Sequence, residues 1–379
     1  MIRRWLGVLL LGATAGGNAA AAQVARVSLE PIVTIGAEGS GTNLVRVILA
    51  ARVRTGDIAV LTNSPPELLL FSSNGTLRKR LGRPGSGPGE FSLLWWAGRD
   101  GDSVLVYDFS LARATVFDIP RDTVWTLPFL PKGAPGRLVV GGKLDGGSWL
   151  ALGMPRPYPD QHPDGPFRDT TTAYRWQPDS SATVLATFRN LALFAHNPKS
   201  DPGSTHFRFD PLLANAAILT HGGRVWIADP STDSVVVLDS DGQGWSTFGV
   251  PLPSGEYNPA VVRHVRDNLL ATARRSTDSA LTTAAFDLSR RPPRGPRAAR
   301  LLPGPAGQVW IEAFRVDPSA ATEYVLVDAR GRVQLRLTGP PAVRFHDIGP
   351  DYALGVHRNA DDVETVVLFR VARVGDPPG

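Results

Sequence analysis

Arginine and histidine recur together in two short segments that could bind an anion. "HFRFD" covers residues 206–210 and "VRFHD" covers residues 343–347, and each stands beside a stretch of alternating apolar residues. Guanidinium and imidazole groups donate charge-assisted hydrogen bonds, so such a cluster suits a carboxylate, a phosphate or an acidic sugar. With two further charged residues that precede similar stretches, the candidate ligand-binding residues are Glu90, Arg137, His206, Arg208, Arg344 and His346. The competing interpretation is that these positions only reflect the abundance of arginine in the chain.

Motifs of catalysis and metal binding are scarce. The sequence holds no G-x-S-x-G, H-E-x-x-H or Walker pattern, and it holds no cysteine. Glu90, His206 and His346 are the candidates for a metal-assisted site, and His162 lies near Asp160, Asp164 and Asp169 but without recognisable ligand spacing. We expect no cofactor, with calcium or another divalent metal as the alternative.

The glycine-rich stretch "LRKRLGRPGSGPGEF", residues 77–91, could be a phosphate loop or a chain reversal. A phosphate loop leads into a helix and usually carries Gly-Lys-Ser/Thr, whereas this stretch leads into "FSLLWWAGRDGDSVLVYD", which has the composition of strands. Proline fixes φ and glycine permits positive φ. The sequence therefore predicts a corner that returns Phe91 to the core.

The elements that must position these residues form six similar units. Each unit has an apolar strand, a polar loop and a second apolar strand, and the units start at Asp57, Asp102, Gly147, Gly223, Gly307 and Asp351. Further apolar stretches flank most units, which gives about four strands each, the composition of a propeller blade. One unit cannot cover both of its faces, so the units must pack against one another.

The predicted fold is all-β: a six-bladed β-propeller of four-stranded blades in a single domain over residues 23–379. The last unit lacks an outer strand of its own, whereas "VSLEPIVTIG", residues 27–36, is a strand without a unit. Because exposed strand edges must be covered, we expect this N-terminal strand to join the last blade and close the ring.

Three insertions elaborate the units, at about residues 154–171, 190–210 and 251–300. In the third, Asn258 can cap a short helix with Pro259 at its first position. Val261, Val265 and Leu269 then share one face of that helix. All three insertions fall at loops of one face, where binding sites commonly lie, although they could also serve only to shield the ring.

The first 22 residues have the pattern of a secretory signal peptide, with Arg3 and Arg4 before an apolar run and small residues at the end. We expect cleavage after Ala22 and a periplasmic or secreted, monomeric protein. No other stretch is long and apolar enough to cross a membrane. The formal charge of +5 is too small to indicate a nucleic acid as partner.

Several segments carry a family resemblance. "TIGAEGSG", "FSSNGTLRKRLGRPGSGPGEF", "VLVYDFSLARATVFD", "VWIEAF" and "GPDYALGVHRNADDVETVVLFRV" resemble the bacterial exported six-bladed β-propeller proteins related to NHL-repeat propellers. The resemblance covers the chain after residue 22 except the insertions, and it departs most in the third unit. It implies the propeller fold and export, but no particular activity.

Two functions follow as expectations. The first is an exported, non-catalytic propeller that binds a protein, peptide or glycan on its loop-elaborated face. The alternative is a metal-dependent propeller hydrolase or lyase whose site lies at the mouth of the central channel. The absence of catalytic motifs favours the first.

Overall fold

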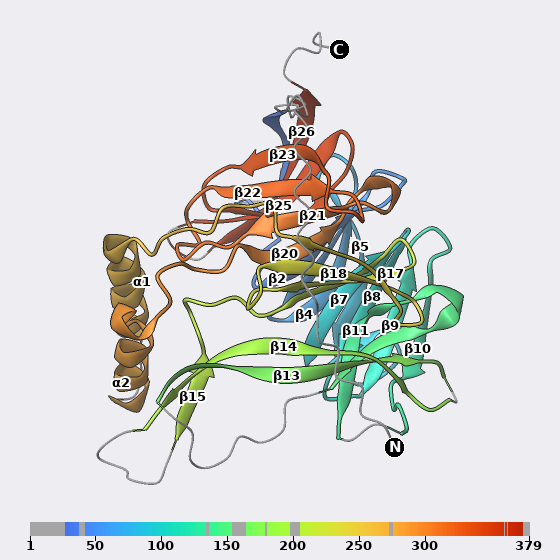
Figure 1. The fold of residues 1–379 in the computed structure, drawn as a ribbon. Coiled ribbons are helices and arrows are strands. Elements are labelled where there is room, and N and C mark those ends of the chain that lie inside the picture. Colours follow the sequence, from blue (N-terminus) through green and yellow to red (C-terminus); the bar gives the residue numbers. More distant parts are fainter. Residues whose placement is uncertain are drawn as a thin grey trace, which may run out of the picture.

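The computed structural model describes residues 27–37, 42–133, 136–153, 164–178, 180–197, 205–272, 276–359, 361 and 363–373. The expected signal peptide and the segment around His162 lie outside these residues. Within them, valine, leucine and aromatic residues build six β-sheets, as their preference for pleated, half-buried surfaces leads one to expect. The chain is therefore all-β, and Figure 1 shows the sheets with one pair of helices at the edge of the molecule.

The sheets follow one another along the sequence. The first sheet contains β2 (Val47–Arg52), β3 (Ile58–Asn63), β4 (Pro66–Phe71), β5 (Leu77–Pro84) and β6 (Glu90–Phe91). The second contains β7 (Leu94–Asp100), β8 (Ser103–Asp108), β9 (Arg113–Asp118) and β10 (Thr123–Pro128). The third contains β11 (Leu138–Lys143), β12 (Trp149–Gly153), β13 (Gly165–Trp176), β14 (Thr183–His196) and β15 (His206–Phe209). The fourth sheet contains β16 (Ala217–His221), β17 (Arg224–Asp229), β18 (Ser234–Asp239) and β19 (Gly244–Gly249). The fifth contains β20 (Ala298–Pro303), β21 (Val309–Ala313), β22 (Thr322–Val327) and β23 (Val333–Gly339). The sixth contains β24 (Val343–Ile348), β25 (Tyr352–Arg358), β26 (Glu364–Arg373) and β1 (Val27–Ile35).

The first strand of each sheet contacts the first strands of its neighbours. These contacts join β2 to β7, β7 to β11, β11 to β16, β16 to β20, β20 to β24 and β24 to β2. Six apolar clusters fill the spaces between adjacent sheets, including one between the first and the last. Each sheet thus buries both faces against its neighbours, which is how such units gain a core.

The N-terminal strand β1 pairs antiparallel with β26, from Val27 opposite Arg373 to Ile35 opposite Val366. Ile35 is buried in the cluster between the first and last sheets, and Val27 packs against the cluster between the fifth and sixth. The pairing that the sequence predicts between residues 27–36 and the last unit is present.

The corner prediction is confirmed. Gly85 and Gly89 have φ of 148° and 72°, conformations that favour glycine, between β5 and β6. Phe91 returns to the core and is buried between the first two sheets.

Other expectations differ from the structure. The first and third sheets have five strands rather than four, because β6 and β15 add short fifth strands. Residues 165–171 and 190–196, expected within loops, belong to β13 and β14, which form a hairpin longer than the other strand pairs. The pairing of β13 with β14 extends this hairpin toward the helices (Figure 1).

The third insertion holds two helices, α1 (Pro259–Thr272) and α2 (Ser276–Ala285), with short 3-10 turns at Leu288–Arg290 and, elsewhere, at Asp145–Gly147 and Pro305–Gly307. The Asn258 side chain caps α1 by accepting a hydrogen bond from the Ala260 N–H at 2.9 Å, as expected. The buried face centres on Val262 rather than Val261, because it packs against Leu212 and Phe286. Leu269 is 37% exposed and lies outside this cluster, whereas Val265 packs against it.

Candidate functional site

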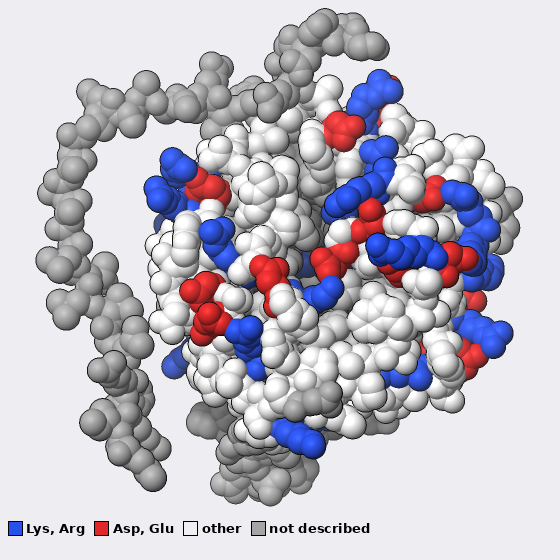
Figure 2. Space-filling model, turned by 90° about the vertical axis from the view of Figure 1, so that its right-hand side faces the viewer, with Lys and Arg blue, Asp and Glu red and all other residues white. Residues whose placement is uncertain are grey.

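The first strands of the six sheets surround a cavity of about 700 Å³. Its lining comes mainly from β2, β7, β11, β16, β20 and β24, and from the turns that follow β2, β7, β11 and β16. Arg54, Asp102 and Asp145 lie in these turns. These turns lie at the ends of the strands that point away from α1 and α2. The cavity therefore extends toward the face of the molecule opposite the helices. Figure 2 shows the face, where acidic and basic side chains lie together across the middle of the molecule.

Most charges of the cavity lining are paired. Three ion pairs of 2.5 to 3.5 Å join different sheets: Arg54–Asp102, Lys143–Asp100 and Arg99–Asp347. Asp347 also accepts hydrogen bonds from the Arg52 N–H and the Tyr352 hydroxyl, both at 2.9 Å. These pairs join separate sheets, and Asp347, which accepts from three donors, offers little to a ligand.

One group of charges beside the cavity, of which Arg300 alone is a lining residue, is not balanced. Glu312 of β21 is 2% exposed and accepts hydrogen bonds from the Nε atoms of two arginines, Arg300 at 2.7 Å and Arg344 at 3.0 Å. Arg300 also donates to the Phe345 carbonyl oxygen at 2.5 Å. Two guanidinium groups on one carboxylate leave one positive charge without a counter-charge. Arg344 is the more exposed of the two, and within the described residues its Nη atoms make no hydrogen bond.

His346 lines the cavity two residues after Arg344. Burial lowers its pKa well below the ordinary value, and the charges of Arg300 and Arg344 lower it further. Its imidazole is therefore neutral at neutral pH and can accept or donate one hydrogen bond beside the two guanidinium groups. His221, also in the lining, has its Nε2 atom 2.8 Å from the Gly304 carbonyl oxygen, and burial lowers its pKa as well.

Two of the other sequence-predicted site residues have structural contacts. Glu90 accepts hydrogen bonds from the Gly87 N–H and the Arg83 Nε, each at 2.8 Å, which lower its pKa and fasten the corner. Arg137 lies with its guanidinium carbon 3.6 Å from the centre of the Phe109 ring and donates to the Phe109 carbonyl oxygen. Neither side chain lines the cavity.

His206 and Arg208 lie on β15, the fifth strand of the third sheet, rather than at the start of a first strand. Arg208 donates to the Thr282 hydroxyl of α2, on the side of the helical insertion. The segments "HFRFD" and "VRFHD" are therefore not equivalent, because the first extends a hairpin edge and the second is β24 itself. Of the six predicted residues, the structure places Arg344 and His346 together.

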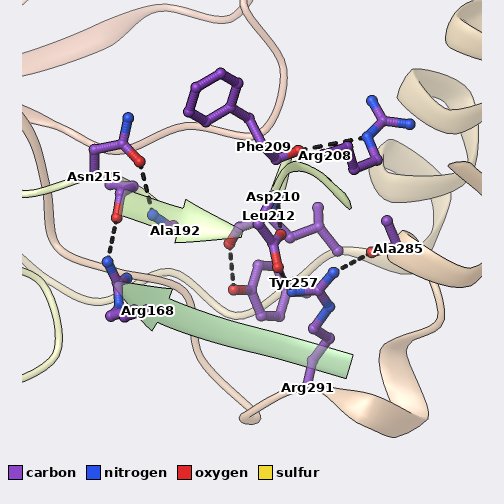
Figure 3. Close-up of polar contacts among 11 residues, drawn as sticks. Arg168, Ala192, Arg208, Phe209, Asp210, Leu212, Asn215, Tyr257, Ala285 and Arg291 are labelled. Carbon is purple, nitrogen blue, oxygen red and sulfur yellow. Dashed lines mark hydrogen bonds and ion pairs between the residues drawn. The ribbon is translucent and has the colours of Figure 1, made fainter. Parts of the chain in front are cut away.

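Beneath the helical insertion lies a buried polar cluster, drawn in Figure 3. Arg291 and Asp210 form an ion pair whose two side chains are inaccessible to solvent, and Arg291 also donates to the Ala285 carbonyl oxygen. The Tyr257 hydroxyl donates to the Leu212 carbonyl oxygen at 2.6 Å, and burial raises the pKa of Tyr257 to about 12. Burial also raises the pKa of Asp210. Since these groups bond one another, the cluster fastens the insertion to the third sheet.

Sequence reasoning missed Arg300 and Glu312. The signal was a glutamate inside the apolar strand "VWIEAF", because a buried carboxylate needs cationic partners. No group of three histidine or acidic residues within the described part of the chain could hold a metal ion. Neither helix described is long and apolar enough to span a membrane.

Neither a protein-family model nor a curated protein matches the chain. Among solved structures, a member of the DUF4221 family from Bacteroides vulgatus is similar with a TM-score of 0.52 and 7% identity, over 93% of this chain and 100% of that one. A protein from Bacteroides fragilis whose name describes it as exported has a TM-score of 0.47 and 12% identity, over 92% of this chain and 95% of that one. A streptogramin B lyase has a TM-score of 0.40 and 7% identity, over 92% of this chain and 98% of that one. The first likeness concerns the fold alone, and together with the sheets it identifies a fold of the β-propeller type.

Proposed function

We propose that the chain is an exported, non-catalytic β-propeller that binds a protein, peptide or glycan ligand through an acidic group of that ligand. In this proposal the six sheets are six blades of one ring, β1 closes the ring, and the chain belongs with the NHL-related propellers that it resembles. The apolar clusters between all adjacent sheets and the pairing of β1 with β26 support this architecture.

The observation that carries the binding proposal is the surplus positive charge of Arg300 and Arg344 on one buried carboxylate. Arg344 is the second residue of β24, on the side of the molecule that holds the helical insertion, so its half-exposed side chain can receive a ligand from that side. A guanidinium presents two parallel N–H donors to a carboxylate or phosphate. Neutral His346 beside it adds one hydrogen bond without repelling the ligand.

Titration calorimetry with inorganic phosphate, citrate and D-glucuronate tests this site on the full chain. We expect at least one of these probes to bind, and Arg344→Gln to weaken its binding about tenfold, the worth of one charge-assisted hydrogen bond. The matched control is Arg336→Gln, which removes an arginine paired with Glu323 on the outer strand of the neighbouring sheet. Equal binding by wild type and Arg344→Gln, or no binding of any probe, would overturn the proposal.

A further inference from the structure

A second exposed feature lies at the start of β7, outside the cavity. Trp95 is 51% exposed, and its ring packs against that of Phe109 at a tilt of 31°, with 5.3 Å between centroids. The Arg137 guanidinium packs on the same Phe109 ring. Leu93, also largely exposed, adjoins them through a 2.8 Å hydrogen bond from the Phe109 N–H to its carbonyl oxygen. We name Leu93, Trp95, Phe109 and Arg137 the Trp95 platform.

Hydrogen bonds to a buried carboxylate hold the backbone of the platform in place. The buried Asp108 carboxylate accepts hydrogen bonds from the Ser92 N–H at 2.6 Å and the Leu93 N–H at 3.0 Å. Its other oxygen accepts from the Leu111 N–H at 2.8 Å. These bonds join the start of β7 to the loop that carries Phe109. A ligand would therefore meet an ordered aromatic surface and would have little side-chain entropy to overcome.

The Trp95 platform faces the same side of the molecule as Arg344. Trp95 is the second residue of β7 and Arg344 the second residue of β24, and both strands run from this side toward the turns that line the cavity. The two residues therefore lie at the same end of strands β7 and β24, which are the two neighbours of β2.

The composition of the platform indicates the class of ligand. Tryptophan, phenylalanine and arginine are enriched at the centres of protein interfaces, and an exposed apolar cluster on a monomer commonly marks a docking surface. A sugar also stacks on tryptophan but needs polar groups around its rim, whereas the neighbours of Trp95 on the platform are apolar apart from Arg137. One donor of Arg137 is already used by the Phe109 carbonyl.

We propose that the occupant of the Trp95 platform is an acidic peptide segment of a partner protein. An apolar side chain of the peptide rests on Trp95 and Phe109, while its carboxylates face the positive charges of Arg137 and Arg344. This inference rests on the proposed function and narrows its ligand from three classes to one.

The labelled full chain is applied to two arrays. One array carries synthetic hexapeptides, each with one Trp, Phe or Leu and one to three Asp or Glu, and the other carries neutral and uronic-acid oligosaccharides. The labelled full chain is compared with Trp95→Ala, Arg344→Gln and Trp125→Ala. Trp125 is a matched control, because it is 45% exposed on β10, the opposite edge of the same sheet. Thermal melting checks that each variant is folded.

We expect the chain to bind acidic, apolar hexapeptides, with affinity about thirtyfold lower in Trp95→Ala and unchanged in Trp125→Ala. Peptide binding that depends on Arg344 but not on Trp95 would overturn the platform and leave the proposed function intact. Binding of oligosaccharides alone would overturn the peptide class, again without harm to the proposed function. Failure to bind either array, or binding untouched by Arg344→Gln, would overturn both.

Discussion

Replacing Glu312 by Gln tests whether this carboxylate holds two arginines beside the cavity. The variant keeps the shape of the side chain but leaves Arg300 and Arg344 without a counter-charge. Breaking a buried ion pair by removing one partner costs about 3–5 kcal/mol. Because the side chains of Arg300 and Arg344 are 27% and 47% exposed and can be hydrated, the lower limit applies, about 3 kcal/mol. At about 2 °C per kcal/mol for a chain of this size, the melting temperature should fall by about 6 °C.

Urea unfolding and calorimetry of Glu312→Gln measure this loss. The control is Glu323→Gln in the adjacent strand β22, whose pair with Arg336 is about one third exposed on both sides and should contribute under about 1 kcal/mol. The double variant Glu312→Gln with Arg344→Gln should recover part of the loss, because one of the two unpaired cations is gone. If Glu312→Gln is no less stable than Glu323→Gln, Glu312 does not hold the two arginines by its charge.

Two further predictions concern other buried groups. Because the folded pKa of His346 lies below its unfolded value of about 6.5, the unfolded chain binds a proton there that the folded chain does not, and stability should fall as the pH drops below about 6.5. Unfolding measured between pH 7 and 5 should show a shallower fall for His346→Gln, and an unchanged slope would count against burial of this imidazole. Asp210→Asn leaves Arg291 buried without its partner and should cost about 3–5 kcal/mol. Hydrogen exchange should then rise in α1 and α2, and unaltered protection there would show that the pair does not fasten the insertion.

Much of the fold could be predicted because its signals are local. Alternating apolar residues mark the paired strands, and turn residues such as Asn74-Gly75 separate them. The N-terminal strand stood out because it had no unit to join and the last unit lacked an edge. Asn258 likewise identified the start of α1.

What could not be predicted depends on contacts between distant segments. The extension of β14 to His196 depends on the pairing of β14 with β13 and β15, which adjacent residues do not encode. The face of α1 that is buried depends on Leu212 and Phe286. Arg300 is the cross-strand partner of Glu312 within the fifth sheet, whereas Arg344 meets Glu312 only because the fifth and sixth sheets are neighbours. Sequence patterns therefore singled out Arg344 and His346, which lie near each other, but not the carboxylate that pairs with the two arginines.

In the proposed ring, β1 completes the last sheet by pairing with β26 and so closes the circle of blades. Glu30 and Arg370 are directly opposite across β1 and β26, both exposed, and the chain contains no cysteine. Opposed residues of antiparallel strands have Cα atoms about 4.5–5.5 Å apart, within reach of a disulfide. In the double variant Glu30→Cys with Arg370→Cys, mild oxidation and mass spectrometry should find a bond within one chain. Free thiols, or bonds only between chains, would contradict the closed ring.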